Sequence, residues 1–140
     1  MVSLRPAEPS DRERLRELLA EYLLELDGST TPYPYFDAYW SELDRFPYLI
    51  DAEGEIVGFC LIRVADDGWH IAEFSILPHQ RRKGIGRSAV QDLAERARAA
   101  GAAHLEARVL AGNRSALDFW LTLGFSVIEQ PGAIVTRLKL

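Results

Sequence analysis

Four cationic side chains surround two glycines in residues 81–87, which read RRKGIGR. Glycine lets the backbone approach an anion closely, and the start of a helix adds a partial positive charge and free N–H groups. This basic turn follows the mostly apolar residues 72–77 and precedes a pattern of helical period. Because the whole chain carries a formal net charge of −5, the positive charge is local. The pattern predicts a binding site for a phosphate group.

Two common nucleotide-binding motifs fit the basic turn poorly. A Walker loop requires G-x-x-x-x-G-K-[ST], which is absent. Residues 84–89 satisfy the dinucleotide pattern G-x-G-x-x-A, and Glu106 follows at the expected distance for a ribose contact. However, the partly cationic residues 78–83 separate Gly84 from the preceding strand, and the residues after Gly86 are too few for the rest of that fold. A nicotinamide-dependent oxidoreductase is therefore a minor alternative.

The first half of the chain reads as a strand, two helices and an antiparallel meander. A strand is predicted over residues 2–5, and a capping-box pattern at residues 10–13 begins a helix that ends at Gly28. Pro47 stops a shorter second helix, whose apolar face consists of Phe36, Tyr39, Trp40 and Leu43. Three strands then follow as hairpins over residues 48–51, 55–64 and 69–77.

The second half begins with a crossover. A helix runs from Gly84 to Gly101, a strand follows over residues 104–110, and a helix over residues 114–123 ends at Gly124. The last strands are predicted over residues 125–129 and 133–140. A strand, helix and strand in this order make parallel strands. We therefore predict an α/β protein of α+β type, with a mixed sheet and helices packed on both faces.

Two motifs in register resemble those of the GNAT superfamily of N-acetyltransferases. Arg81, Gly84 and Gly86 match the acetyl-CoA motif Q/R-x-x-G-x-G/A, and residues 113–125, NRSALDFWLTLGF, match the segment N-x-x-A-x-x-[FY]-[YFW]-x-x-x-G-F. The opening residues 4–7 and the capped helix after them also look like the start of many members. The resemblance implies one GNAT domain over residues 1–140, with residues 27–47 as its weakly matched part.

The resemblance implies that acetyl-CoA is the co-substrate and that its pyrophosphate binds at the basic turn. In the family, two parallel strands splay apart, and the pantetheine arm pairs with the free edge of the strand before the turn, here residues 73–77. Asn113 could cap the following helix, contact the pantetheine, or do both. The expected coenzyme-binding residues are Ile76, Arg81, Arg82, Lys83, Gly84, Ile85, Gly86, Arg87, Ser88, Asn113 and Trp120.

Trp120 and Glu73 bear on the chemistry. Trp120 stands where many family members have a tyrosine that is proposed to protonate the leaving thiolate. An indole does not titrate usefully, so we expect Trp120 to line the thioester channel or to pack in the core. The thiolate would then take its proton from solvent, the ammonium or a side chain such as Ser75.

Glu73 is the candidate general base, because it interrupts an apolar strand at a position that resembles an acidic site of some members. A surface carboxylate paired with a neighbour is the alternative.

Half of the aromatic residues lie in residues 33–48, the region that covers the acceptor pocket in the family. Tyr33 and Tyr35 lie outside the apolar helix face, and nearby carboxylates such as Asp27 and Asp37 would suit a cationic amine. A solvated acidic helix face is the alternative interpretation. The expected acceptor-binding residues are Tyr33, Tyr35, Glu73 and Ser75.

Composition argues against several other classes. The single cysteine, Cys60, lies in an apolar strand and reads as a buried small residue. His70, His79 and His104 fall in different elements, so we predict no metal site. An acidic chain with one short basic patch is unlike a duplex-binding protein, and no apolar stretch has the length of a membrane span, so we expect a cytoplasmic protein with no nucleic-acid or membrane partner. Both a monomer and a homodimer stay open.

We therefore expect an acetyl-CoA-dependent N-acetyltransferase that acetylates a primary amine of a small molecule or peptide by direct attack of the amine. The alternative is a non-catalytic acyl-CoA-binding regulatory module, which the tryptophan at position 120 would favour.

Overall fold

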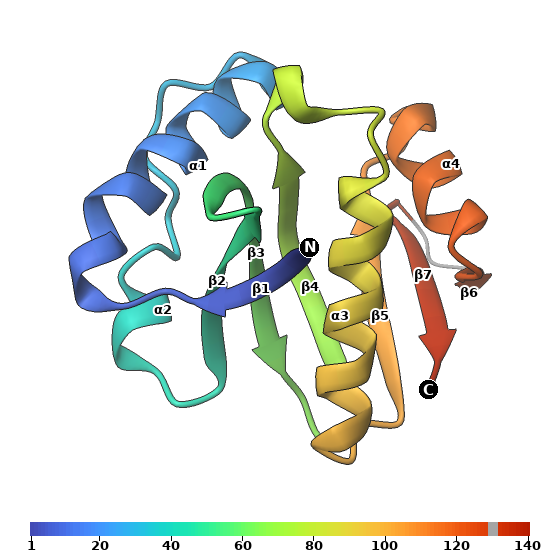
Figure 1. The fold of residues 1–140 in the computed structure, drawn as a ribbon. Coiled ribbons are helices and arrows are strands. Elements are labelled where there is room, and N and C mark those ends of the chain that lie inside the picture. The colour runs from blue at the N-terminus through green and yellow to red at the C-terminus, as the bar shows by residue number, and fades with distance from the viewer. Residues whose placement is uncertain (129–131) are drawn as a thin grey trace.

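The computed structural model describes residues 1–128 and 132–140, with a mixed sheet of seven strands at the centre of the fold (Figure 1). The strands lie in the order β1-β2-β3-β4-β5-β7-β6. Their bounds are β1 Val2–Pro6, β2 Arg45–Ala52, β3 Glu55–Val64, β4 Trp69–Ile76, β5 His104–Val109, β6 Ser126–Ile128 and β7 Ile134–Lys139. The helices are α1 Arg12–Asp27, α2 Ala38–Ser41, α3 Ile85–Ala99 and α4 Arg114–Thr122, with short 3-10 helices η1 Pro9–Asp11 and η2 Pro78–Gln80.

The connections between strands agree with the predicted topology. Strands β1 to β4 form an antiparallel meander. Helix α3 then crosses from β4 to β5, and these two strands pair in parallel. Strand β7 lies between β5 and β6 and is antiparallel to both. The predicted mixed sheet with one parallel crossover is confirmed.

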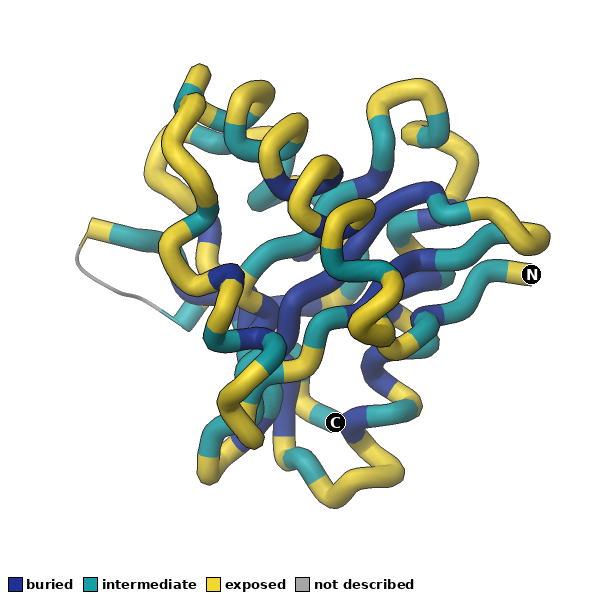
Figure 2. Tube along the Cα trace, turned by 90° about the vertical axis from the view of Figure 1, so that its left-hand side faces the viewer, coloured by how far each residue is buried: buried dark blue, intermediate teal, exposed yellow. Residues whose placement is uncertain are grey.

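Helices cover both faces of the sheet, as predicted (Figures 1 and 2). Alternate residues of β3 enter two different cores: Cys60 and Ile62 contact the core beneath α3 and α4, whereas Phe59 and Leu61 contact the core beneath α1 and α2. A strand that is buried on both faces is expected to be apolar throughout. Figure 2 shows the buried residues along the central strands and exposed residues on the outer sides of the helices.

The second helix is shorter than predicted. Backbone bonds from Phe36 to Tyr33, from Tyr39 to Phe36 and from Trp40 to Asp37 follow a three-residue step, and only Ala38–Ser41 is α-helical. Leu43 is 96% exposed and therefore does not share the buried face. The prediction that Pro47 stops this helix was wrong.

Pro47 lies inside β2, opposite Leu61, and its carbonyl accepts a bond from the Ala7 N–H. Pairing of β1 with β2 begins only at Tyr48, so Pro47 lies at a margin of the sheet where its missing N–H is tolerated.

Other differences are confined to element ends. Helix α1 begins at Arg12, and the Glu8 N–H donates to the Asp11 carboxylate at 2.8 Å, so the capping contact precedes the predicted one. The predicted final strands are shorter, and Glu129 lies outside the described residues. Across residues 1–128 and 132–140, we find no helix with the length and apolar composition that crossing a membrane requires.

Candidate active site

A bulge in β4 turns Glu73 toward α1. Strands β3 and β4 pair Leu61 with Glu73 but Ile62 with Ile71, so Ala72 is an extra residue in β4. Ile71 and Phe74 consequently contact the core beneath α3, although they are three residues apart. Glu73 projects from the opposite face, where it reaches the Tyr22 side chain of α1. Bulges commonly redirect a side chain in this way.

Two tyrosine hydroxyls hold the Glu73 carboxylate. Tyr22 donates to Oε1 at 2.8 Å, and Tyr33 donates to Oε2 at 3.2 Å. Burial raises the pKa of Glu73 above its usual value of 4.5, while the two hydrogen bonds act to lower it. Burial and the adjacent Glu73 charge raise the pKa of both tyrosines, so their hydroxyls stay protonated. A raised pKa makes a carboxylate a better proton acceptor.

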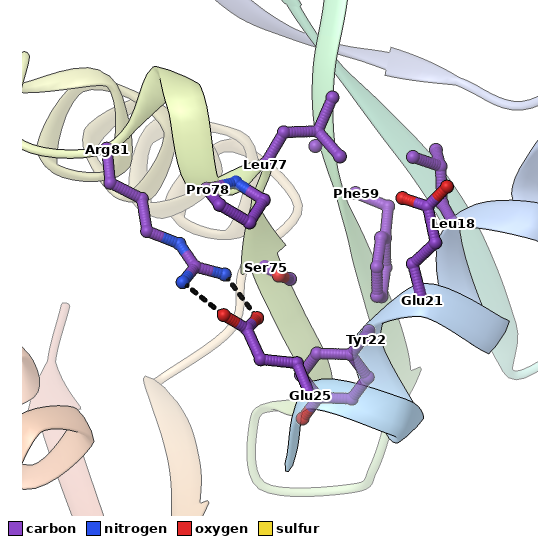
Figure 3. Close-up of a pocket in the computed structure, with 10 residues that line it drawn as sticks. Leu18, Glu21, Tyr22, Glu25, Phe59, Ser75, Leu77, Pro78 and Arg81 are labelled. Carbon is purple, nitrogen blue, oxygen red and sulfur yellow. Dashed lines mark hydrogen bonds and ion pairs between the residues drawn. The ribbon is translucent and has the colours of Figure 1, made fainter. Parts of the chain in front are cut away.

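A pocket of about 170 Å³ lies between α1 and the adjoining parts of β3 and β4 (Figure 3). Apolar side chains such as Phe59 and Leu77 line it beside the polar Ser75. The exposed carboxylates of Glu21 and Glu25 line its α1 side, one helical turn apart. Tyr22 also lines this pocket and therefore connects it to Glu73.

A second pocket, of about 320 Å³, lies between α1 and residues 29–37. Tyr33 lines this pocket, and its hydroxyl donates a hydrogen bond to Glu73. Glu73 is thus one hydrogen bond away from each pocket, through a different tyrosine. Glu73 is not among the residues that line either cavity, so a tyrosine lies between the carboxylate and each of them.

Arg81 is already engaged by protein groups. Its guanidinium donates to both Glu25 carboxylate oxygens, at 2.7 and 2.6 Å (Figure 3). Its Nε also donates to the Ile76 carbonyl at 2.8 Å. This bidentate pair links α1 to the turn that follows β4. Arg82, Lys83 and Arg87 are exposed, and no ion pair to them is found among the described residues. These three cations are the ones immediately accessible to an anion.

The start of α3 presents backbone donors to the same region. The Ser88 N–H bonds to the Gly84 carbonyl, so the N–H groups of Ile85, Gly86 and Arg87 precede the first bond within the helix. Gly84 has φ 79°, and Arg82 has φ 63°, which is a strained value for a residue with a side chain. Ile85 is buried and anchors the helix start. The backbone and exposed cations together form a site that fits a phosphate group.

Gly86 has a packing role that the sequence did not indicate. A Cβ at this position would lie 3.0 Å from the Phe119 ring. The absence of a side chain at Gly86 therefore allows the Phe119 ring of α4 to pack against the start of α3.

The edge of β4 that faces β5 is open beyond the first three residue pairs. Pairing of the two strands covers Trp69, His70 and Ile71 and is not found for Glu73 to Ile76. The side chains of Phe74, Phe119 and Trp120 are packed together on this side, with ring centroids 4.9 to 5.8 Å apart. The open edge leaves backbone groups of β4 available to an extended ligand.

Asn113 and Trp120 lie on α4. Asn113 caps the helix, since its side-chain oxygen accepts from the Ala116 N–H at 3.2 Å. Trp120 is 5% exposed and contacts the Phe125 ring in addition to Phe74 and Phe119. The tryptophan is therefore a packed aromatic side chain.

Tyr35 lies apart from Glu73. It is 55% exposed, contacts Tyr33 edge to face, and has the Arg45 guanidinium 5.3 Å from its ring centre. A cation of the protein therefore already lies over this ring. Of the aromatic residues predicted for the acceptor, the structure brings Tyr33 to Glu73 and leaves Tyr35 at the surface.

Comparison with known proteins identifies the family of this chain. The profile of the acetyltransferase (GNAT) family matches residues 12–125. The chain belongs to the GNAT family. It is accordingly an acyltransferase, and the match spans α1, the basic turn and α4.

Relatives of this GNAT protein include N-acetyltransferases of named substrate. A protein of Bacillus subtilis (strain 168), provisionally named a ribosomal protein bS18 alanine N-acetyltransferase, is 26% identical over 125 residues, covering 86% of this chain and 80% of the relative. The crystal structure of the Escherichia coli ribosomal-protein-S18-alanine N-acetyltransferase has a TM-score of 0.77 at 20% identity, covering 99% and 94% of the two chains. That of the PaiA N-acetyltransferase from Thermoplasma acidophilum, in complex with coenzyme A, has a TM-score of 0.80 at 16% identity, covering 100% and 99%. These structures share the fold of this chain.

The sequence pattern does not predict Tyr22 or Glu25 as residues of the candidate site. Tyr22 occupies the apolar stripe of α1, where it reads as a core residue. The signal was its hydroxyl, because a buried tyrosine normally requires a hydrogen-bond partner. Glu25 lies on the exposed side of α1 and carries no local pattern that would indicate its pairing with Arg81.

Proposed function

We propose that this chain transfers the acetyl group of acetyl-CoA to a primary amine of a small molecule or peptide. The observation that carries the proposal is the placement of Glu73: a half-buried carboxylate with a raised pKa, on the strand that leads directly to the basic turn. The start of α3, the exposed cations of that turn and the open edge of β4 fit the phosphates and the extended arm of the coenzyme.

In the proposed reaction the amine attacks the thioester carbonyl. A carbon–nitrogen bond forms, the carbon–sulfur bond breaks, the amine loses one proton and the thiolate gains one. Glu73 accepts the amine proton, directly or through a water molecule, because burial raises its pKa above the usual value and makes it a better proton acceptor. Tyr22 and Tyr33 fix the orientation of the carboxylate. Trp120 supplies no titrating group, so the thiolate takes its proton from solvent, and Glu73 afterwards releases the amine proton to solvent.

The acceptor we propose is a cationic amine. Glu21 supplies an exposed negative charge at the pocket beside Tyr22, where Glu25 is paired with Arg81, and this charge attracts an ammonium group before it is deprotonated. The names of the bacterial relatives make the alanine amine of a ribosomal protein one candidate acceptor, and small amines and amino acids are others.

The proposal is tested by measuring release of free CoA thiol from acetyl-CoA over a panel of amines, amino acids and peptides with a free N-terminus. Turnover with at least one cationic amine, and its loss in Glu73→Gln with retained coenzyme affinity, is expected. Coenzyme binding without turnover on any acceptor would overturn catalysis and favour the acyl-CoA-binding module.

The coenzyme site has its own test. Charge reversal at Arg82 and Lys83 should weaken acetyl-CoA binding by roughly tenfold or more, because both side chains are exposed beside the start of α3. Arg98→Glu is the matched control, since Arg98 is an exposed arginine at the other end of the same helix. If both variants bound acetyl-CoA equally well, the assignment of the phosphates to the basic turn would be wrong.

A further inference from the structure

Two histidines and an aspartate from separate elements meet at the end of the sheet opposite the basic turn. Asp67 lies in the turn between β3 and β4, His70 is the second residue of β4, and His104 is the first residue of β5. Parallel pairing of β4 with β5 places these strand starts side by side, at the lower end of the sheet in Figure 1. The sequence suggested no metal site because the two histidines are far apart in the chain.

The separations within this cluster are longer than hydrogen bonds and come close to the distances between the ligands of one metal ion. The Nε2 atoms of His70 and His104 lie 3.8 and 3.6 Å from the Asp67 carboxylate oxygens. Hydrogen bonds to nitrogen are shorter, about 2.7 to 3.2 Å. Zinc bonds of about 2.0 to 2.2 Å place neighbouring ligand atoms of a tetrahedron about 3.3 to 3.6 Å apart. One ligand atom from each residue lies within 4.8 Å of the other two.

Both imidazole Nε2 atoms are buried and lack a hydrogen-bond partner among the described residues. His104 is only 7% exposed, so its Nε2 is withheld from solvent while it faces Asp67. Gly68 makes this approach possible, because a Cβ there would lie 2.8 Å from the same Nε2. A buried polar atom without a partner is costly, and a bound ion would remove that cost.

Other charged groups surround His70. Glu106 is 6% exposed, and its carboxylate lies 3.6 Å from His70 Nδ1 and accepts from Arg137 at 2.9 Å. At 3.6 Å this carboxylate lies beyond hydrogen-bond distance of Nδ1, and a closer contact to it in the ion-bound protein would orient the imidazole so that Nε2 can bind the metal. Arg63 contacts the same Nδ1 at 3.1 Å, and Arg137 lies 3.9 Å from Asp67, so two cations oppose a second positive charge here.

We propose that Asp67, His70 and His104 bind a divalent transition-metal ion, with Zn²⁺ as the representative. Two imidazoles and one carboxylate match the ligand preferences of zinc and leave a fourth position for water. The ion would join the β3–β4 turn to β5. In the ion-bound protein, His70 Nδ1 would carry a proton and donate it to Glu106, and the present contact between Nδ1 and Arg63 would be lost. The site is separate from the proposed acetyl-transfer site.

The test uses the full chain, without an affinity tag and freed of metal by a chelator. Titration calorimetry with Zn²⁺ should give one site per chain, and the melting temperature should rise with the free Zn²⁺ concentration once it exceeds the dissociation constant. Titration with Co²⁺ should give the visible absorption bands of a coordinated ion with nitrogen ligands. No binding in the calorimeter and no such bands overturn the proposal.

Variants identify the ligands. Asp67→Asn and His70→Gln should each weaken Zn²⁺ binding at least tenfold, and both lie in partly exposed positions that tolerate the change. His79→Gln is the matched control, because His79 is an exposed histidine outside the cluster. Glu106→Gln should weaken binding roughly tenfold, as removal of a carboxylate behind a histidine ligand does. Arg63→Leu should tighten it by removing an opposing charge. Binding unchanged in both Asp67→Asn and His70→Gln, or lost in His79→Gln, would place the ion elsewhere and overturn the assignment.

Discussion

The Tyr22 hydroxyl donates a 2.8 Å hydrogen bond to the Glu73 carboxylate and so joins α1 to the bulged centre of β4. Burial raises the pKa of Glu73, while this bond and the one from Tyr33 lower it. The proton affinity of the candidate base is therefore a balance between the surrounding core and two tyrosines. Each side of that balance can be changed separately.

Removal of the Tyr22 hydroxyl should move the pH dependence of acetyl transfer. The hydroxyl stabilises the ionised carboxylate, so Tyr22→Phe raises the pKa of Glu73 further, and the acid limb of kcat/KM should shift to higher pH by about one pH unit. The rate above that limb should return close to the wild-type value. Tyr33→Phe should shift the limb less, because its bond is longer at 3.2 Å. Tyr35→Phe, at an exposed position, is the control. If the acid limb did not move in Tyr22→Phe, ionisation of Glu73 would not control the rate.

Glu73 should also leave a signature in stability. Because its pKa is raised in the folded state, the folded protein retains a proton that the unfolded chain loses as pH rises above about 4.5. The stability of the wild type should therefore fall as pH rises through the window between 4.5 and the raised pKa. Glu73→Gln cannot ionise, so its melting temperature relative to wild type should increase across that window and then level off. Glu95→Gln makes the same change on the exposed side of α3 and should give no such trend; a parallel response of the two variants would argue against a raised pKa.

Several features of this site were predictable from local pattern, and others depended on distant contacts. The parallel crossover and the helix cap at Asn113 follow from period and capping residues, and both are found. The bulge at Ala72 carries no local signal, because it arises from how β3 and β4 pair. Similarly, the meeting of His70 with His104 depends on strand order, which brings distant residues together. The types and spacing of residues along the sequence predict a ligand site. The hydrogen-bond partners of each side chain depend on the tertiary structure.

The Arg81–Glu25 pair should compete with the coenzyme. Glu25 holds the guanidinium with two short bonds, so a phosphate can gain Arg81 only by replacing that carboxylate. Glu25→Gln should therefore tighten acetyl-CoA binding, by no more than about fivefold because the pair is exposed and screened by solvent. Calorimetric affinities at low and high salt measure the effect, which should shrink as salt rises. Glu21→Gln, one turn away, is the matched control. Weaker binding in Glu25→Gln would show that the pair positions the turn for the coenzyme rather than competing with it.

Trp120 should prove dispensable for proton transfer and important for packing. Its indole lies among three phenylalanine rings and is 5% exposed, so Trp120→Phe keeps an aromatic side chain in the same core and should leave kcat within about threefold of wild type. Trp120→Ala leaves a cavity and should lower the free energy of unfolding by about 3 to 5 kcal/mol, measured by denaturant titration. Trp120→Tyr introduces a titratable hydroxyl, and an unchanged pH profile in that variant is expected, because the hydroxyl would be packed against Phe74 and Phe125. A large fall in kcat in Trp120→Phe without loss of stability would instead give the indole N–H a direct role at the thioester.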